Sequence, residues 1–278
     1  MKSFVLLSML VIAAVALPPE WQRDGFPLER FEKRIIGGQI AATGQFPYYA
    51  RLMLTKRRFG RIVGSLCGGS LISNRVVLTA AHCVDQALSG LVYVGSSTIH
   101  STETASVTIK VEKTAFIIHE GWNSLSFSND IALILLPRPV QFNNVVKPVN
   151  LPKANEGDLV GRTGVISGFG LIGNSGGPAQ ELRYLPRRIM EPKYCNSAYP
   201  TRFSSSSHVC VDGSYAKSAC PGDSGGPLVL EEANGSGILV GLTSFGSMSC
   251  EMGYPTVYTR ITSYLNWINQ KTDTSIRN

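Results

Sequence analysis

The sequence predicts an all-β protein that consists of two sandwiches or two barrels. Long helical periodicity is scarce, and most of the chain alternates between short apolar runs and turn residues. The runs are rich in Val, Ile, Leu and Thr and are separated by Gly, Pro and Asn, which is typical of many short strands. The chain has 278 residues, of which 44% are apolar, so it can bury a sizeable core.

The N-terminal residues 1–16, MKSFVLLSMLVIAAVA, contain one lysine, an apolar run and an Ala-Val-Ala end. This order is typical of a secretory signal peptide, and the run is shorter than the roughly 20 residues that span a bilayer. A buried N-terminal helix is the alternative, but Pro18 and Pro19 follow directly. The sequence therefore predicts a secreted, extracellular protein without a membrane partner.

A charged, proline-bearing segment follows at residues 17–34 and ends in Lys33-Arg34. We interpret this segment as an activation propeptide. The remaining residues, 35–278, contain no low-complexity tract and no linker. Since all-β barrels of roughly 200–250 residues often count as one domain, we expect a single domain there.

The expected strands lie in short segments spread over this domain. The segments are SLISNRVVLTAA (70–81), LVYVGSS (91–97), IALILLP (131–137), TGVISGFG (163–170), PLVLEEANGSGILVGLTSFG (227–246) and TVYTRI (256–261). Asn234-Gly235 predicts a hairpin, and Asn234 also begins a glycosylation sequon, so both interpretations stay open. Only Ser263–Lys271 reads well as a helix, with Leu265, Trp267 and Ile268 on one face.

Charge and cysteine content narrow the class of protein. The net charge is +7, and a short basic cluster lies at residues 56–61, KRRFGR. One such cluster in an exported chain is more typical of a solvated loop than of a nucleic-acid site. An even number of cysteines in an exported chain favours disulfides. A zinc site is the alternative, but no C-x-x-C or H-x-x-H spacing occurs. The six are Cys67, Cys83, Cys195, Cys210, Cys220 and Cys250.

The stretch CPGDSGGPL, residues 220–228, contains a candidate nucleophile, Ser224, in what could also be an ordinary glycine-rich loop. A nucleophilic serine needs a base and a group that orients the base. The stretch fits the G-x-S-x-G pattern of α/β-hydrolases, but all four histidines precede Ser224, whereas that fold places its histidine last. The Asp-His-Ser order of subtilisins needs an acid before the base, and residues 35–81 contain none. The order His-Asp-Ser remains open.

His82 and Asp130 are the best candidates for the base and the orienting acid. His82 ends the apolar run VVLTAAHC, beside Cys83, and a satisfied core histidine is the alternative interpretation. His100, His119 and His208 lie in polar surroundings that predict surface positions. Asp130 opens the run IALILL, and a carboxylate in such a run is costly to bury unless it is paired.

Four motifs together resemble the chymotrypsin family of serine proteases. They are IIGG (35–38), LTAAHC (78–83), NDIALILL (129–136) and GDSGGPL (222–228). The resemblance covers residues 35–278 in the family's order, and it extends more specifically to arthropod digestive chymotrypsins and elastases and to the brachyurin-like collagenolytic subgroup. It implies two packed six-stranded antiparallel β-barrels, a C-terminal helix and an active site between the barrels.

The resemblance implies a serine endopeptidase with an acyl-enzyme mechanism. Ser224 would attack the scissile carbonyl, His82 would move the proton, and Asp130 would hold the imidazole. The backbone N–H groups of Gly222 and Ser224 would form the oxyanion hole. The family's local disulfide pairings would be Cys67 with Cys83, Cys195 with Cys210 and Cys220 with Cys250.

The same resemblance implies that the chain is made as a zymogen. Cleavage between Arg34 and Ile35 would free a new N-terminus, and its ammonium group would pair with Asp223 and shape the oxyanion hole. IIGG as a plain strand that enters a glycine turn is the alternative, but the basic pair before it favours processing.

Three positions are expected to set the primary specificity pocket. The floor position holds Ser218 where a trypsin-like enzyme would have Asp, Gly246 leaves the entrance open, and Thr256 makes the pocket shallower. We therefore expect apolar P1 residues, namely Leu, Met, Phe or Tyr, with Ala and Val also accepted. Ser244, Phe245 and Gly246 would pair with the substrate backbone as an added strand.

The expected partners are protein or peptide substrates, an activating trypsin-like protease and proteinaceous inhibitors. We expect a monomer that binds neither nucleic acid nor a metal, since the loop after LVYVG has one glutamate and is a poor calcium site, and no cofactor is expected. Three rival functions are a trypsin-like processing protease, a non-catalytic protease homologue that acts as a binding protein, and a lectin-like secreted β protein.

Overall fold

The computed structural model describes residues 38–100, 106–232, 235–247 and 249–272. By its internal contacts the chain divides into Met1–Phe31 and Glu32–Asn278. The expected signal peptide, the propeptide and the Arg34–Ile35 cleavage point all lie outside the described residues, and so does Asn234. None of the helices in the described ranges has the length and apolar character that crossing a bilayer requires.

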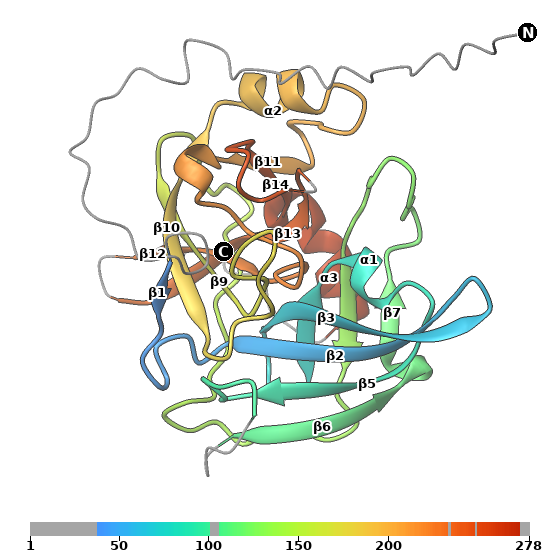
Figure 1. Cartoon of the computed structure of the whole chain (residues 1–278). Coiled ribbons are helices and arrows are strands. Elements are labelled where there is room, and N and C mark those ends of the chain that lie inside the picture. The colour runs from blue at the N-terminus through green and yellow to red at the C-terminus, as the bar shows by residue number, and fades with distance from the viewer. Residues whose placement is uncertain (1–37, 101–105, 233–234, 248, 273–278) are drawn as a thin grey trace, which may run out of the picture. The chain divides into compact units, whose positions relative to one another are not determined.

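The described residues form a mainly β structure, as the sequence predicts. The first half contains β1 Gln39–Ile40, β2 Tyr49–Arg58, β3 Arg61–Leu71, β4 Val76–Thr79, α1 Ala81–Val84, β5 Ala87–Val94, β6 Val107–Glu112, η3 Lys113–Ala115, β7 Phe116–Ile118 and β8 Ala132–Leu135. The second half contains β9 Thr163–Gly168, β10 Arg183–Met190, α2 Pro192–Ala198, β11 His208–Val211, η4 Ser214–Ala216, β12 Pro227–Glu231, β13 Gly237–Phe245, β14 Thr256–Arg260, η5 Ile261–Tyr264 and α3 Leu265–Lys271. Figure 1 shows these elements in chain order.

The second half is a closed barrel. Its strands follow the order β10-β11-β14-β13-β12-β9, and β9 pairs with β10 again to close the ring of six, with β1 added alongside β10. The β12–β13 hairpin is confirmed by antiparallel pairing from Pro227↔Leu242 to Glu231↔Gly237. All barrel pairings are antiparallel.

The first half is a curled, open sheet, which differs from the expected closed barrel. Its order is β6-β5-β2-β3-β4-β8-β7, so β6 and β7 form the two edges. The two edge strands are consecutive in the chain, and only the 3₁₀ turn η3 separates the end of β6 at Glu112 from the start of β7 at Phe116. The interruption splits what would be one closing strand into two edge strands. The result still matches the expected architecture in strand content and order of elements.

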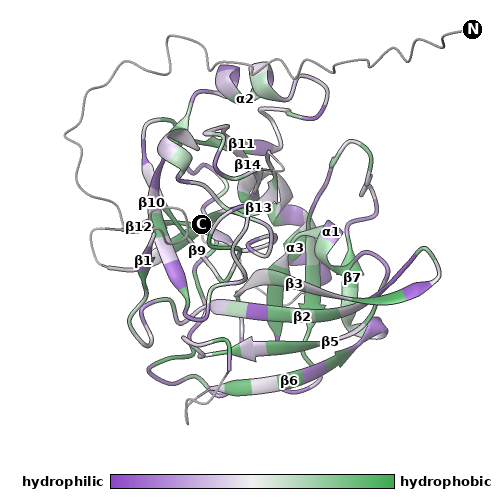
Figure 2. Cartoon of the chain, viewed as in Figure 1, coloured by the Kyte–Doolittle hydropathy of each residue, from purple (hydrophilic) through white to green (hydrophobic). Residues whose placement is uncertain are grey.

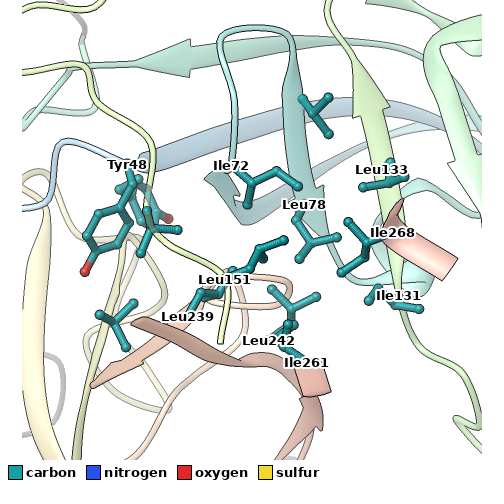
Figure 3. Close-up of a cluster of buried hydrophobic side chains, with 14 of the residues drawn as sticks. Tyr48, Ile72, Leu78, Ile131, Leu133, Leu151, Leu239, Leu242, Ile261 and Ile268 are labelled. Carbon is teal, nitrogen blue, oxygen red and sulfur yellow. The ribbon is translucent and has the colours of Figure 1, made fainter. Parts of the chain in front are cut away.

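Three main apolar clusters hold the structure together. One lies within the first sheet, one within the barrel, and one joins the two halves. The joining cluster includes Leu78 and Leu133 of the first sheet and Leu239 and Leu242 of β13, as Figure 3 shows. Figure 2 shows the matching hydrophobic colour along the strands that face these clusters. Burying a Leu or Ile side chain typically contributes about 1.5–3 kcal/mol, so this cluster fixes the two halves together.

The helix expected at Ser263–Lys271 is confirmed from Leu265 onward, and the turn before it is 3₁₀. Leu265, Trp267 and Ile268 are buried, as the predicted apolar face requires. The helix is tied to the first half because the indole N–H of Trp267 donates to Glu120 Oε2 at 2.9 Å, and Lys271 Nζ lies 2.6 Å from Glu120 Oε1.

Candidate active site

His82 lies on the single helical turn α1, directly after the buried strand β4. The Cys67–Cys83 disulfide ties this turn to β3. The His82 side chain is 22% exposed, so one face of the ring reaches solvent while the other is held by protein. A strand end followed by a disulfide-bonded turn thus fixes where the imidazole points.

Asp130 contacts His82 with both carboxylate oxygens. His82 Nδ1 lies 2.8 Å from Oδ2, and the backbone N–H of His82 donates to Oδ1 at 2.9 Å. The hydroxyl of Ser244 donates a further hydrogen bond to Oδ2 at 2.6 Å. Asp130 is fully buried, and these donors offset the desolvation of its carboxylate.

Ser224 lies in the turn between Cys220 and β12, next to the His82 segment. Its carbonyl accepts from the N–H of Gly68 on β3 at 2.8 Å. The Cys83 sulfur lies 3.4 Å from that carbonyl oxygen and 3.9 Å from His82 Nε2. The structure therefore brings His82, Asp130 and Ser224, which are far apart in sequence, into one place.

Two glycines of this turn have positive φ and little room. Gly225 has φ +73°, and a Cβ there would lie 2.7 Å from the Gly68 carbonyl oxygen. Gly222 has φ +102°, and a Cβ there would lie 3.0 Å from Gly170 Cα. Any other residue at Gly225 would collide with the first sheet, so the glycine lets the turn pack closely against it.

Asp223 is a buried carboxylate that points away from solvent, next to Ser224. It accepts from the backbone N–H of Gly170 at 2.7 Å and of Cys220 at 2.9 Å. Desolvation by burial raises its pKa to about 6, against the lowering effect of these two hydrogen bonds. The ion pairs of the described residues include none with Asp223. Ile35, its expected partner, lies outside them.

The three expected pocket residues lie around the Cys220–Cys250 disulfide and the end of β13. Ser218 is buried, and its hydroxyl donates to the Cys250 carbonyl at 3.0 Å. Gly246 follows β13, and a Cβ built there would lie 3.7 Å from Thr256 Cγ2 and Oγ1. Gly246 and Thr256 thus face each other, as an entrance and a wall of one pocket would.

The three disulfides are Cys67–Cys83, Cys195–Cys210 and Cys220–Cys250. These are the pairings that the family resemblance implies. The ligand atoms of Cys67, His82 and Cys83 also cluster within 4.8 Å of one another. Both sulfurs are consumed by one disulfide, so this cluster offers no thiolate to a metal ion.

One of the histidine predictions is wrong. His208 is only 2% exposed, whereas His100 is exposed and His119 half-buried. The His208 ring packs 5.5 Å from the Phe245 ring and 5.8 Å from the Phe203 ring, and its Nδ1 accepts from the N–H of Ser204 at 3.0 Å. Burial lowers the pKa of His208, so it packs as a neutral ring. Its polar sequence neighbours gave no sign of these long-range contacts.

Three site contacts were not predicted from the sequence. The Ser244 hydroxyl supports Asp130, Thr259 Oγ1 donates to the Asp130 carbonyl at 2.7 Å, and Lys56 Nζ donates to the His82 carbonyl at 2.7 Å. The Phe127 ring, 5.7 Å from the His82 ring, covers one side of the imidazole. Ser244 and Lys56 lie in segments to which the sequence assigned other tasks, and only the folded strands bring these side chains to His82 and Asp130.

A β protein with a closed barrel, a curled sheet and a Ser, His and Asp gathered between them has the architecture of a serine endopeptidase. The Trypsin family model matches residues 35–268, so the chain belongs to this family. Brachyurin of Leptuca pugilator is 39% identical over 240 residues, covering 86% of this chain and 98% of that protein. Collagenase of Hypoderma lineatum is 37% identical over 268 residues, covering 95% of this chain and 97% of that protein.

A solved structure, that of HL collagenase, matches with a TM-score of 0.76 and 36% identity. The match covers 86% of this chain and 99% of that one. The chain is therefore a trypsin-fold serine protease that resembles arthropod enzymes and acts on proteins or peptides.

Proposed function

We propose that the chain is a secreted serine endopeptidase, made as a zymogen, that cleaves after apolar residues through the triad His82, Asp130 and Ser224. The observation that carries the proposal is the pair of contacts between His82 and Asp130, 2.8 Å and 2.9 Å long, beside Ser224. Such a pair fixes the tautomer of the imidazole, leaving Nε2 to accept the proton of the serine hydroxyl.

In the proposed reaction, Ser224 Oγ attacks the scissile carbonyl while His82 Nε2 takes its proton. His82 then gives that proton to the leaving amine, and the acyl group stays on Ser224. Water then attacks the ester with His82 again as base, and His82 gives the proton taken from water to Ser224 Oγ as the bond between the acyl carbon and Oγ breaks, which releases the acid product and restores the serine hydroxyl. Asp130 stays ionised throughout and stabilises the imidazolium that forms.

The oxyanion hole is proposed to consist of the backbone N–H groups of Gly222 and Ser224. In this turn, the N–H groups of Asp223, Gly225 and Gly226 donate to the carbonyls of Cys220, Thr243 and Asp223. The hydrogen bonds among the described residues include none from the N–H groups of Gly222 and Ser224. These two donors are thus free for the developing oxyanion, and losing one typically costs about 10²–10³ in kcat.

The proposed P1 preference is apolar: Leu, Met, Phe or Tyr, with Ala and Val accepted. Its support is the neutral, buried Ser218 at the pocket floor, whose hydroxyl is already bound to the Cys250 carbonyl. A Lys or Arg side chain would find no carboxylate there and would stay uncompensated on burial. Ser244–Gly246 would bind the substrate backbone on this side of the scissile bond.

Activation is proposed to follow cleavage between Arg34 and Ile35. The support is Asp223, a buried carboxylate beside the nucleophile that receives only backbone donors among the described residues. The ammonium group of a new N-terminus would compensate this charge and fix the turn that carries Gly222 and Ser224. An activating trypsin-like protease and protein inhibitors are the further proposed partners of a secreted monomer.

The proposal is tested by labelling and by substrate profiling. We expect a fluorophosphonate to label the trypsin-treated chain at Ser224, and Ser224→Ala to lose both labelling and acyl-enzyme burst kinetics. Asp130→Asn should lower kcat by about 10⁴-fold, since the imidazole then adopts the wrong tautomer. Retained burst kinetics in Ser224→Ala would contradict the assignment. A P1 peptide library with a preference for Arg or Lys would favour the trypsin-like alternative.

A further inference from the structure

The hairpin formed by β2 and β3 projects beyond the sheet that carries it. The pairing of β2 with β5 ends at Lys56↔Ala87, while its pairing with β3 continues to Arg58↔Arg61. Figure 1 shows the light-blue tip of the hairpin extending past β5. The residues expected to form a solvated loop, 56–61, are therefore two paired strand ends and a two-residue turn.

The turn at this tip is unusual because it contains an aromatic residue. Phe59 has φ +47° and Gly60 has φ +76°, so both central residues are left-handed. Hairpin turns of this kind favour Asn, Asp or Gly, and a bulky residue in this region is strained. The Phe59 side chain is 98% exposed, so it makes no packing contact that offsets the strain. Strain of this kind is typical of functional positions.

The positive charges at the tip also destabilise the hairpin. Arg58 and Arg61 lie directly opposite each other, and like charges in that arrangement are destabilising. Arg57, Arg58 and Arg61 are exposed, and the ion pairs of the described residues include none of them. Ile62 lies directly opposite Arg57 and is 58% exposed, and Met53, further down the same face of the hairpin, is 47% exposed. Figure 2 shows the resulting mixture of purple and green along this hairpin.

The base of the hairpin is part of the active site. Lys56 Nζ donates to the His82 carbonyl at 2.7 Å, and Gly68 N–H donates to the Ser224 carbonyl at 2.8 Å. Leu66 on β3 lies beside Gly222, since its Cδ2 would be 3.4 Å from a Cβ built there. Side chains on one face of paired strands alternate, so Lys56 shares its face with Arg58 and Arg61. Arg58 and Arg61 therefore lie on the face whose base contacts His82, whereas Arg57 and Ile62 lie on the opposite face of the hairpin.

β3 also offers an open edge along this path. Among the described residues, β3 pairs with β4 only at Ser70 and Leu71, so Arg61–Leu66 have a partner strand on one side only. An extended peptide can add to such an edge. From Leu66 to Arg61 the strand spans roughly 17 Å, or about five residues of an extended chain.

We propose that this hairpin is a docking surface for the part of a protein substrate that follows the scissile bond. The occupant is an extended segment that runs antiparallel to β3 and carries acidic side chains about five to eight residues beyond the cleaved bond, with apolar residues nearby. The acidic side chains meet Arg57, Arg58 and Arg61, and an apolar residue meets Phe59 or Ile62. The inference rests on the proposed function, because the proposed nucleophile Ser224 and the proposed oxyanion hole are what locate the scissile bond.

Three peptides test this surface. All peptides share one sequence up to the scissile bond. They differ beyond it, with three Glu residues at positions six to eight, the same three at positions fourteen to sixteen, or neutral residues throughout. A short substrate that ends in a chromogenic leaving group directly after P1 measures the active site alone. We expect about tenfold higher kcat/KM for the proximal Glu peptide than for the neutral one, through KM, and loss of this advantage at about 0.5 M salt.

The matched variants are Arg57→Ser/Arg58→Ser/Arg61→Ser and, as a control with equal loss of charge, Arg138→Ser/Lys147→Ser/Lys153→Ser. The control residues are exposed and follow the end of β8 that lies away from Asp130. The hairpin variant should lose the tenfold advantage and keep its rate on the short substrate within about twofold. The control variant should keep both. If all the peptides carry a leucine beside these positions, Phe59→Ser should raise KM severalfold for each of them, because the ring no longer covers that leucine.

Fluorescence anisotropy measures the affinity of the peptides for the same variants in a Ser224→Ala background. This affinity reports docking in the absence of catalysis. Equal affinity for the proximal Glu and neutral peptides would overturn the proposal. So would a hairpin variant that loses retention on a heparin column while its peptide kinetics and affinities stay unchanged, since the surface would then bind an anionic polysaccharide. Failure of every variant and of the parent to cleave the short substrate would contradict the proposed function instead.

Discussion

Asp130 and Asp223 are both buried carboxylates, and their surroundings give them different tasks. Asp130 receives the His82 ring, the His82 N–H and the Ser244 hydroxyl. Asp223 receives two backbone N–H groups, which compensate its burial only in part, so its pKa is raised to about 6. The hydrogen bonds of Asp130 include charge-compensating side chains, whereas those of Asp223 come from the backbone alone, which is the observation behind the proposed pairing with a new N-terminus.

The raised pKa of Asp223 predicts a pH-dependent stability of the uncleaved chain. Between its ordinary pKa of 3.8 and about 6, the folded chain holds a proton that the unfolded chain releases. The free energy of unfolding should therefore fall as pH rises through this window, by about 3 kcal/mol at most, and stay low above it. Thermal denaturation of the Ser224→Ala precursor from pH 4 to 7 measures this fall.

Asp223→Asn removes the titrating group, so that precursor should show a flatter profile over the same range. Cleavage after Arg34 should also flatten it, because an ammonium partner stabilises the ionised carboxylate. A Ser224→Ala precursor whose stability rises between pH 4 and 6 would refute the interpretation.

At the residue scale, the sequence was sufficient where a side chain sits in a strong local pattern. His82 follows a buried strand and precedes Cys83, and Asp130 opens a run that had to be buried, so both could be found. His208 and Lys56 could not, because the His208 ring packs on Phe245 of β13 and Lys56 contacts His82, 26 residues along the chain. The serines that precede His208 in the sequence are compatible with a buried ring as well as with an exposed one.

At the element scale, α3 connects the C-terminus to the strands that carry the site. Ile268 is fully buried in the cluster that joins the two halves, close to Leu78 and Ile131 in Figure 3. Leu78 lies in the strand that leads to His82, and Ile131 directly follows Asp130. The contact of Ile268 with this cluster therefore stabilises the two segments that carry these side chains. The periodicity of the segment predicted this face, while the 3₁₀ turn before it has no clear sequence signal.

We predict that Ile268→Ala lowers the free energy of unfolding by about 2–5 kcal/mol, because it leaves a cavity in this cluster. Denaturant unfolding with a fluorescence readout measures the change. Gln270→Ala, an exposed position on the same helix, should change stability by less than about 0.5 kcal/mol. Equal effects of the two substitutions would show that α3 is not anchored through its apolar face.

Strand positions were predictable because Val, Ile and Thr runs and glycine turns mark them locally. The tip of the β2–β3 hairpin was not, since Phe59-Gly60 lacks the Asn-Gly or Asp-Gly signal of a tight turn. The opening of the first sheet was also missed, because a break at Lys113–Ala115 depends on how the sheet curls and not on a breaker residue.

At the scale of the whole molecule, activity is proposed to depend on one cut outside the described residues. We predict that Arg34→Gln prevents activation by trypsin, because no new N-terminus then reaches Asp223. Hydrolysis of an apolar P1 substrate and N-terminal sequencing measure the result, and the parent should yield Ile-Ile-Gly-Gly. Arg30→Gln, which leaves the Arg34–Ile35 bond intact, is the control and should activate normally. Full activity of the uncleaved Arg34→Gln chain would contradict the zymogen proposal.

The bonds around Asp130 have a consequence for how the enzyme fails. His82 and Asp130 belong to the first half, whereas Ser244, Thr259 and Ser224 belong to the second. Asp130, a member of the proposed triad, therefore also connects the two halves through its hydrogen bonds to Ser244 and Thr259. If the halves part slightly, Ser224 moves away from His82 while every strand remains folded. Catalytic activity therefore depends on the packing of the two halves against each other. During denaturation we expect activity to be lost before any spectroscopic sign of unfolding.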